Sequence, residues 1–408
     1  MANTKKSDLS NFVIIFMIII ISPSTFMFGT NKNSVFTIIP TIFLALLFLF
    51  FLSKNTRPKD GTTKEIAQYL AGIIALSALT MLVNQDFKGG YVINILSFVI
   101  AFLFVLNVSF RTFIFYFERA IFIIASYSLI VMIIYLIMGT LPFPQITNVN
   151  GYEHYNAFLS TLPVYDSTLN GRLYGPFREP GVFQIFLNVA LAFHIYLEKR
   201  ITFLRGAVYI TAVLLTFSTA GYIVLTGILV SWLLGGNKIK YKKYYLLLLL
   251  VAFGFLFYGT DFFALGGKAF VKFSESGLDN ASTVSRLGSI WGNLDIMLHN
   301  PLVGVGYTKV ATMFREYCAI NYGVGIGVSN TNTILYQFAA MGVFYGLLWF
   351  IPFYRFFSNL GMAKAASHVL GISIMLSFMG ENMIENIIVY IFIGYGLVYS
   401  NKRLLQKN

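Results

Sequence analysis

Long apolar runs recur along almost the whole chain, and they constrain its fold more than any other feature. Of the 408 residues, 57% are hydrophobic and only 11% are charged, whereas a soluble domain is about one quarter charged. About 12 of these runs approach the ~20 residues that are needed to span a bilayer. They lie at roughly residues 11–29, 34–52, 65–84, 91–110, 113–138, 179–197, 201–218, 220–235, 244–262, 331–356, 364–380 and 383–400. This pattern predicts a single all-α polytopic membrane domain, residues 1–408, with about 12 transmembrane helices.

The basic residues are distributed as a membrane topology would predict. The net charge of +13 would by itself favour a nucleic-acid partner. Most Lys and Arg residues, however, fall near the N-terminus, in the connections at 53–64, 198–205 and 235–243, and in the C-terminal tail. The positive-inside rule then places both termini in the cytoplasm, and no nucleic acid is needed. The first run lacks a small-x-small cleavage site, so we expect it to remain as a helix.

Two long hydrophilic segments, 139–178 and 263–330, lie on the extracytoplasmic side of this predicted topology. Loops of that length in a compact protein are usually functional. The chain contains no Walker-type nucleotide loop, and the single cysteine, Cys318, provides neither an internal disulfide nor a metal site. We therefore expect no cofactor and no metal, and we look for function in the two loops.

The first loop ends in the motif Arg172-x-x-Gly175-x-x-Arg178-Glu179-Pro180, directly before a predicted helix. Proline suits the first position of a helix, and the exposed amides there favour an anion. Guanidinium groups bind phosphate oxygens through paired hydrogen bonds. The motif therefore predicts an anion site at the membrane surface. Snorkelling of the arginines, with an ion pair between Arg178 and Glu179, is the simpler alternative.

The second loop carries another arginine at the head of a predicted amphipathic helix. Arg286 precedes apolar residues at helical spacing, which predicts an interfacial or re-entrant helix. Those apolar residues are Leu287, Ile290, Trp291, Leu294 and Leu298. The helix is expected to end at His299-Asn300-Pro301, because proline disfavours helix in the residue before it. The following Gly304-Val-Gly306 permits a tight turn or a close backbone approach.

Together these motifs resemble those of the O-antigen polymerases and ligases. The similarity rests on Arg-x-x-Gly…Glu-Pro in the first loop and Ser-Arg…Trp…His-x-Pro-Leu-x-Gly-x-Gly in the second. Two further segments add to it, namely Ser329-Asn330-Thr331-Asn332-Thr333 before a helix with Gly342, and the turn Thr216-Phe-Ser218-x-x-Gly221. The motifs cover about residues 165–350, and helix count and loop placement extend the resemblance over the whole chain.

The resemblance implies a GT-C type glycosyltransferase of the bacterial inner membrane that acts at its extracytoplasmic face. Its substrates would be oligosaccharides on undecaprenyl pyrophosphate, with a flippase and a chain-length regulator as partners beside the lipid bilayer. A polymerase transfers the growing chain onto the incoming repeat unit, whereas a ligase transfers the finished glycan to lipid A–core. Neither enzyme needs a metal or a cofactor, and lipopolysaccharide and capsule both remain open as products.

Under this interpretation the two loops supply a pyrophosphate site and a general base. The catalytic candidates are Arg178, Arg286, Glu179 and His299, and the substrate-binding candidates are Arg172, Arg315, Gly304, Gly306, Asn330 and Asn332. Positive charge at the leaving pyrophosphate would stabilise the transition state, and the acceptor hydroxyl needs a base. Glu179, His299 and Glu381 are the outward candidates for that base. An ion pair for Glu179, a helix cap for His299 and plain solvent exposure for Glu381 are simpler alternatives.

Three functions remain to be weighed. Many ligases have a His-Asn pair where this chain has Ser329-Asn330 or Thr331-Asn332, so a histidine base is not carried over and a polymerase is favoured over a ligase. A transporter of lipid-linked glycans is the third possibility. It should place its charged residues inside the spans, whereas here they concentrate in the outer loops. Glu118-Arg119, near the inner end of its helix, predicts a structural ion pair.

Overall fold

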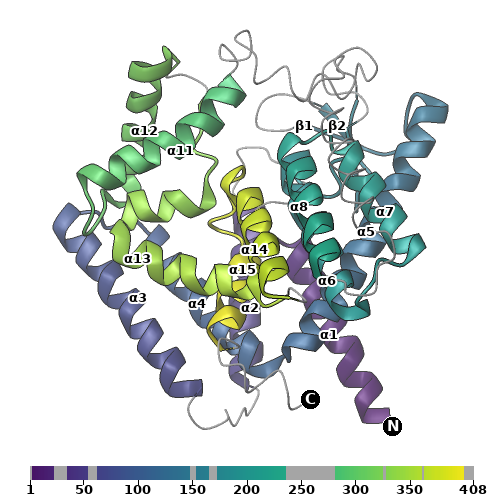
Figure 1. The fold of residues 1–408 in the computed structure, drawn as a ribbon, viewed down its shortest axis with the longest axis horizontal. Coiled ribbons are helices and arrows are strands. Elements are labelled where there is room, and N and C mark those ends of the chain that lie inside the picture. The colour runs from purple at the N-terminus through teal and green to yellow at the C-terminus, as the bar shows by residue number, and fades with distance from the viewer. Residues whose placement is uncertain are drawn as a thin grey trace.

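The computed structural model describes most of the chain, and within the described residues the protein is predominantly helical (Figure 1). The described residues are 2–22, 35–53, 62–147, 153–164, 172–235, 281–324, 328–360 and 363–398. Their helices are α1 (Ala2–Ile20), α2 (Val35–Ser53), α3 (Thr62–Asn84), α4 (Gly90–Asn107), α5 (Phe110–Met138), α6 (Pro180–Glu198), α7 (Phe203–Leu215), α8 (Thr219–Gly235), α11 (Ala281–His299), α12 (Gly306–Tyr322), α13 (Thr333–Ser358), α14 (Lys364–Met379) and α15 (Ile387–Val398).

The apolar helices support the predicted membrane protein. Among the described residues, five helices are long and apolar enough to cross a membrane by length and composition, namely α3, α4, α5, α6 and α13. Large apolar side chains remain exposed on α5, for example Ile130 at 56% and Ile137 at 78%, as expected of a surface that faces lipid. The predicted span at 244–262 lies outside the described residues, so the count of about 12 spans remains a prediction.

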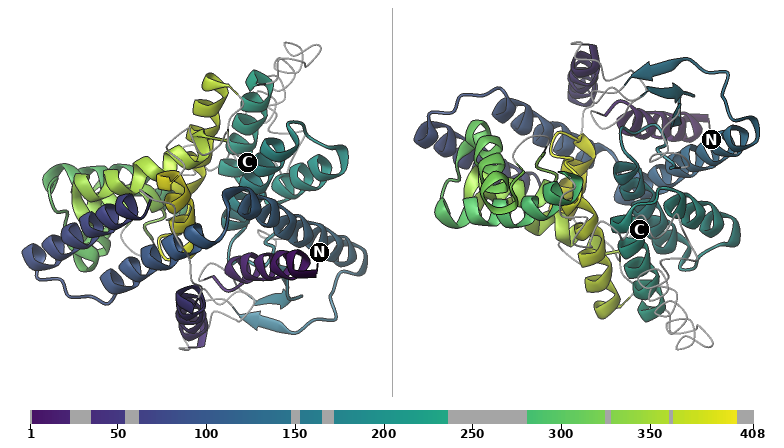
Figure 2. Two further views of the ribbon diagram at one scale, coloured as in Figure 1. Left: turned by 90° about the horizontal axis from the view of Figure 1, so that it is seen from below. Right: turned by 90° about the horizontal axis from the view of Figure 1, so that it is seen from above.

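Helices α14 and α15 connect two groups of helices. Figure 2 shows α15 in yellow between a group that contains α3, α11, α12 and α13 and a group that contains α5 to α8. Helix α14 packs against α8 and α6 on one side and against α13 on the other, while α15 packs between α13 and α4. Every residue of α15 from Ile387 to Gly396 is buried. The short connection between α14 and α15 is therefore held where the two groups meet.

A small β-sheet lies in the first long loop, which the all-α prediction did not include. Strands β1 (Gln145–Thr147), β2 (Glu153–Asn156) and β3 (Thr161–Pro163) form an antiparallel sheet in that order. Strands of three or four residues are too short for a period-2 pattern, so periodicity alone could not reveal them. Figure 1 shows β1 and β2 at the same end of the molecule as α11 and α12, opposite the N-terminus. The described parts of both long loops thus share one end of the helical bundle.

Helix α13 is broken at Gly342, and the segment after α11 completes the break. Gly342 has φ 82° and ψ 174°, which interrupts the helical hydrogen bonds. The amide of Val305 donates to the carbonyl of Ala339 over 3.1 Å, and the amide of Val343 donates to the carbonyl of Pro301 over 2.8 Å. Backbone groups that the break would leave unpaired are thereby satisfied. The Pro-Leu-Val-Gly-Val-Gly motif accordingly has a structural function at α13.

Gly304 and Gly342 make this close backbone contact possible, because a Cβ on either residue would collide with the facing backbone. We therefore expect a substitution at Gly304 to lower stability. A Cβ on Gly304, where φ is 61°, would lie 2.4 Å from the Ala340 carbonyl carbon. Gly304→Ala should therefore lower the free energy of unfolding by about 2–4 kcal/mol, through backbone strain and overpacking. Gly323→Ala is the matched control, because Gly323 has φ 69° but open space around it. Thermal unfolding in detergent should show the larger fall for Gly304→Ala, and equal shifts would contradict this account.

Candidate functional site

The connection between α14 and α15 places a buried carboxylate at the end of the molecule that carries both loops. Glu381 is only 4% exposed, so the expectation of solvent exposure for this residue is wrong. Its Oε1 lies 3.9 Å from Nη2 of Arg286. Burial, followed by the charge of Glu179, raises the pKa of the Glu381 carboxyl to about 8, although nearby arginines act in the opposite direction. Those arginines are Arg286, Arg178 and Arg172.

The backbone of the Glu381 connection is fixed by hydrogen bonds from two sides. Thr333, the first residue of α13, donates its hydroxyl to the carbonyl of Glu381 and accepts from the amide of Met383 over 2.9 Å. The side chain of Asn382 donates to the carbonyl of Asn330 over 3.3 Å. The described connection is thus anchored to α13 and to the loop before it, which restricts where the Glu381 side chain can lie.

Arg178 joins this connection to the start of α6. Its Nη2 donates to the carbonyl of Asn382 over 3.0 Å, so Arg178 binds the backbone beside Glu381 instead of pairing with the neighbouring Glu179. Its Nε is buried and, within the described residues, has no acceptor. Glu179 itself is exposed and caps α6 through its backbone carbonyl, which accepts from the amides of Val182 and Phe183. Arg178 therefore retains an unused donor at the cluster.

Arg172 is held by the turn between α7 and α8. Its Nε donates to the carbonyl of Thr216 over 3.1 Å, and its Nη2 lies 3.5 Å from the carbonyl of Phe217. Phe217 has φ 45°, an uncommon conformation that turns the chain between the two helices. The charges of Arg286, Glu381 and Glu179 all act on the Arg172 guanidinium, which places it in the same cluster. The Thr216-Phe-Ser218 turn is thus an anchor for an arginine of the site.

Helix α11 positions Arg286 through its polar face. Ser285 accepts from the amide of Ser329 over 3.1 Å, and Ser289, one turn later, accepts from the amide of Thr331 over 2.8 Å. One further turn on, Asn293 and Asn330 exchange hydrogen bonds of 2.9 and 2.7 Å. This i, i+4 row fixes α11 against the 328–332 segment. The apolar face of α11 is turned outward, with Trp291 56% and Leu298 71% exposed.

The Asn-Thr-Asn-Thr segment is organised around the start of α13. Asn332 caps this helix, because its Oδ1 accepts from the amides of Ile334 and Leu335 over 3.1 and 2.8 Å. Its Nδ2 is fully buried and has no acceptor among the described residues. Such a group costs free energy unless a ligand or water satisfies it. Asn332 and Arg178 therefore each have a buried donor without an acceptor among the described residues, and Arg178 and Thr333, the residue after Asn332, both bind the backbone of the Glu381 connection.

Gly304 and Gly306 allow close contacts of their backbone with neighbouring segments in this structure. Gly304 contacts the break in α13, and a Cβ on Gly306 would lie 2.6 Å from Oδ2 of Asp86. Asp86 accepts from the amide of Thr308 over 2.9 Å at the start of α12, and from the Tyr91 hydroxyl over 3.1 Å. Burial would raise the pKa of Asp86, but these hydrogen bonds hold it below its usual value. A substrate contact by either glycine remains a prediction.

His299 and Arg315 are not brought to the cluster. His299 ends α11, thirteen residues after Arg286, or roughly 20 Å further along the helix at 1.5 Å per residue. Its ring nitrogen Nδ1 lies 2.9 Å from the carbonyl and 3.6 Å from Oδ1 of Asp295, and its side chain is 72% exposed. Arg315 is exposed on α12 and donates to the carbonyl of Ala311 over 3.3 Å. The roles predicted for these two residues gain no support from their positions.

The assembled cluster is electropositive and can bind an anion. Three guanidinium groups face two carboxylates, so the formal charge is +1 with both carboxylates ionised. Two of the arginines come from the loop before α6 and the third from α11, whose Arg286 lies 3.9 Å from the buried carboxylate of Glu381. Sequence reasoning found the three arginines from their motifs. It did not assign Gly181, Thr333 or Asn382 to the site, because their contacts with Glu381 and Arg178 join segments far apart in the chain.

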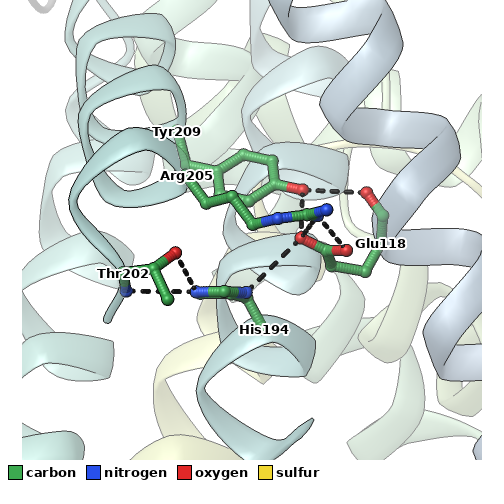
Figure 3. A network of polar contacts seen from close by, with 5 residues as sticks. All are labelled: Glu118, His194, Thr202, Arg205 and Tyr209. Atoms are coloured by element: carbon green, nitrogen blue, oxygen red, sulfur yellow. Dashed lines mark hydrogen bonds and ion pairs between the residues drawn. The ribbon is translucent and has the colours of Figure 1, made fainter. Parts of the chain in front are cut away.

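A second buried charge cluster is centred on Glu118, in the first third of α5. Figure 3 shows this cluster. Glu118 is 3% exposed and forms an ion pair with Arg205 of α7, not with its neighbour Arg119. Tyr209 donates to Oε1 of Glu118 over 3.0 Å, and Nδ1 of His194 lies 3.5 Å from the same oxygen. The predicted pair of Glu118 with Arg119 is therefore wrong, because Glu118 pairs with an arginine from another helix and Arg119 lies over the Phe115 ring. The Glu118 carboxylate thus contacts three side chains, and Nε2 of His194 is bound by Thr202.

No family model, curated protein or solved structure matches the chain. The function of the protein therefore depends on the residues of the site and their chemistry, because a fold alone does not determine a function. The candidate functional site is the Glu381 cluster, which consists of Glu381, Glu179, Arg172, Arg178 and Arg286. It combines buried charged groups, a donor without an acceptor among the described residues, and a carboxyl group whose pKa is raised.

Proposed function

We propose that the protein is an O-antigen polymerase, a glycosyltransferase that joins oligosaccharide repeat units carried on undecaprenyl pyrophosphate. The growing chain would be transferred from its lipid carrier onto the incoming unit. The observation that carries the proposal is that motif arginines from both loops meet at one buried carboxylate: Arg286 lies 3.9 Å from Glu381, and Arg178 donates to the carbonyl of the next residue, Asn382. These are the arginines of the two motifs that resemble the O-antigen polymerases and ligases.

The chemistry of the proposed reaction needs fixed positive charge. Breaking the bond between a sugar and a pyrophosphate leaves negative charge on the departing phosphate oxygen. A preorganised donor aimed at such charge contributes on the order of 2–4 kcal/mol to transition-state stabilisation. Arg172 and Arg178 are already held by backbone carbonyls, so little reorganisation would be required of them. The unused Nε of Arg178 is a donor available to a phosphate oxygen.

The proposal includes a location and an architecture. We place the protein in the bacterial inner membrane with about 12 spans, a GT-C type arrangement, cytoplasmic termini and an extracytoplasmic site. The apolar outer surface of α5 and α11 would let polyprenyl tails remain in lipid while their pyrophosphates reach the arginines. Partners would be the lipid-linked oligosaccharides, a flippase that delivers them and a regulator of chain length.

An O-antigen ligase is the second candidate function. It would use the same lipid-linked donor, so the arginine cluster supports both enzymes equally. The polymerase is favoured because the Asn330 and Asn332 positions lack the preceding histidine found in many ligases. Asn332 instead caps α13. A transporter is less well supported, because the buried charges of the Glu118 cluster are fully paired among themselves.

The test is the length distribution of surface glycan in a strain that lacks the gene. Wild-type protein should restore a ladder of repeat units, and Arg286→Ala should collapse it to core plus one unit. Arg119→Ala is the matched control, because Arg119 is exposed on α5 and stacks on Phe115 at 3.9 Å, away from the cluster. Tagged protein should be present at equal levels in the membrane. Loss even of the single unit would indicate a ligase, and an unchanged ladder with Arg286→Ala would disprove the proposal.

A further inference from the structure

We propose that Glu381 is the catalytic base that accepts the proton of the acceptor sugar hydroxyl. This inference rests on the proposed function and identifies the base that the sequence left open. Its support is geometric, because the carboxylate of Glu381 is buried against Gly181 at the start of α6 and lies 3.9 Å from Nη2 of Arg286, without a hydrogen bond to it.

The carboxylate oxygens of Glu381 are available to a substrate proton. Arg178 and Arg172 direct their guanidinium groups to backbone carbonyls, and Arg286 remains 3.9 Å away. Within the described residues, the Glu381 carboxylate accepts no hydrogen bond at all. A carboxylate saturated by arginines would have no lone pair for a substrate proton, whereas this one has. Because Arg178 and Arg172 bind backbone carbonyls and not Glu381, their remaining N–H groups can bind a phosphate.

The side chain of Glu381 fits closely against the start of α6. Glu381 Oε1 lies so close to Gly181 that a Cβ there would be 1.8 Å from it. Gly181 follows Pro180 in the first turn of α6, where the positive end of the helix dipole favours a carboxylate. The side chain is thus directed over α6, while its backbone is fixed by Thr333 and by Arg178 through Asn382. A general base requires this kind of fixed position.

The other candidate bases lack either burial or a fixed position. His299 is 72% exposed and lies at the far end of α11. Glu179 is exposed at the first residue before α6 and has no fixed side-chain contact among the described residues. Glu381 is the candidate that combines burial with a fixed position. Its pKa of about 8 reflects burial and the charge of Glu179, opposed by the three arginines, and a base works best when its pKa lies near the operating pH.

The proposed reaction forms one glycosidic bond and breaks one sugar–pyrophosphate bond. The acceptor hydroxyl oxygen forms a bond to the anomeric carbon of the donor sugar, while the bond from that carbon to the pyrophosphate oxygen breaks. The electron pair of the broken bond leaves with undecaprenyl pyrophosphate, whose added negative charge is stabilised by the arginines. The hydroxyl proton passes to the Glu381 carboxylate, which later releases it to solvent. No metal, oxidant or further reactant takes part in this sequence.

The experiment uses the full-length protein in lipid vesicles with lipid-linked repeat units extracted from the strain that lacks the gene. Glu381→Gln should slow elongation by about 10²–10⁴-fold, the usual contribution of general base catalysis. Binding of undecaprenyl pyrophosphate should stay within about threefold of wild type, because the arginines remain. Glu385→Gln is the matched control, since Glu385 is exposed in the same connection, and it should elongate normally.

A pH series separates a base from a merely structural carboxylate. Wild-type elongation should rise with pH through about 8 and then level off, because the base acts only when deprotonated. The residual activity of Glu381→Gln should lack that rise. The inference fails if Glu381→Gln elongates within about tenfold of wild type, or if it loses undecaprenyl pyrophosphate binding in proportion to turnover. A wild-type protein that binds the carrier but never elongates would instead overturn the proposed function itself.

Discussion

Glu118→Ala is expected to destabilise the folded protein by about 3 kcal/mol. Removing one partner of a buried ion pair usually costs about 3–5 kcal/mol, because the other charge is left buried and unpaired. For Glu118→Ala we expect a loss at the lower end of this range, because 26% of the Arg205 side chain is exposed and the guanidinium can turn toward solvent. His194 also loses its acceptor. Its Nε2 accepts from the Thr202 amide over 3.2 Å, so the proton of the neutral ring lies on Nδ1, facing Glu118.

A double-mutant cycle with Arg205→Ala measures the pair itself. The two substitutions together should be less destabilising than their sum by about 1–3 kcal/mol, because each already breaks the same contact. Arg119→Ala is the control, as it removes the adjacent exposed charge and should change the free energy of unfolding by less than about 0.5 kcal/mol. Denaturant unfolding in micelles gives all four values. A Glu118→Ala effect below about 1 kcal/mol would show that the cluster contributes little to stability.

Much of the fold could be predicted because hydrophobic length is a local property. The runs that predict spans at 65–84, 91–110 and 113–138 coincide with α3, α4 and α5, since about 20 apolar residues in sequence suffice to identify such a helix. The break in α13 could not be predicted in the same way. Gly342 alone is compatible with an unbroken helix, and only its contact with the segment after α11 shows why the helix is interrupted.

The same distinction explains what could be predicted of the candidate site. Arginine beside Gly and Pro is a local pattern, so Arg172, Arg178 and Arg286 were identified from the sequence. The sequence named Glu381 as a candidate base but favoured solvent exposure for it, because Glu381 and Glu385 have the same chemistry and lie four residues apart in one short connection. Burial separates them, and burial depends on α6, α11 and α13, which are distant in sequence. Partner choice for Glu118 likewise required the arrangement of α5 and α7.

Gly181→Ala is expected to reduce activity by about 100-fold while leaving the protein folded. The added Cβ would lie 1.8 Å from Oε1 of Glu381, whereas carbon and oxygen need about 3.3 Å. The carboxylate must therefore retreat by roughly 1.5 Å, and a misplacement of about 1 Å can cost 10²-fold in rate. Because the end of a flexible side chain moves, and because alanine favours helix over glycine by about 1 kcal/mol, thermal stability should not fall.

This combination of results distinguishes a positioned base from a packing residue. Gly89→Ala is the matched control, since a Cβ on Gly89 meets nothing within 4 Å, and it should retain both activity and stability. If Glu381 only anchored the arginines, Gly181→Ala would lower stability and undecaprenyl pyrophosphate binding together with activity. If Glu381 accepts the substrate proton, elongation alone should fall, and Gly181→Ala combined with Glu381→Gln should be no slower than Glu381→Gln alone. The double variant thus tests whether the glycine acts through the carboxylate.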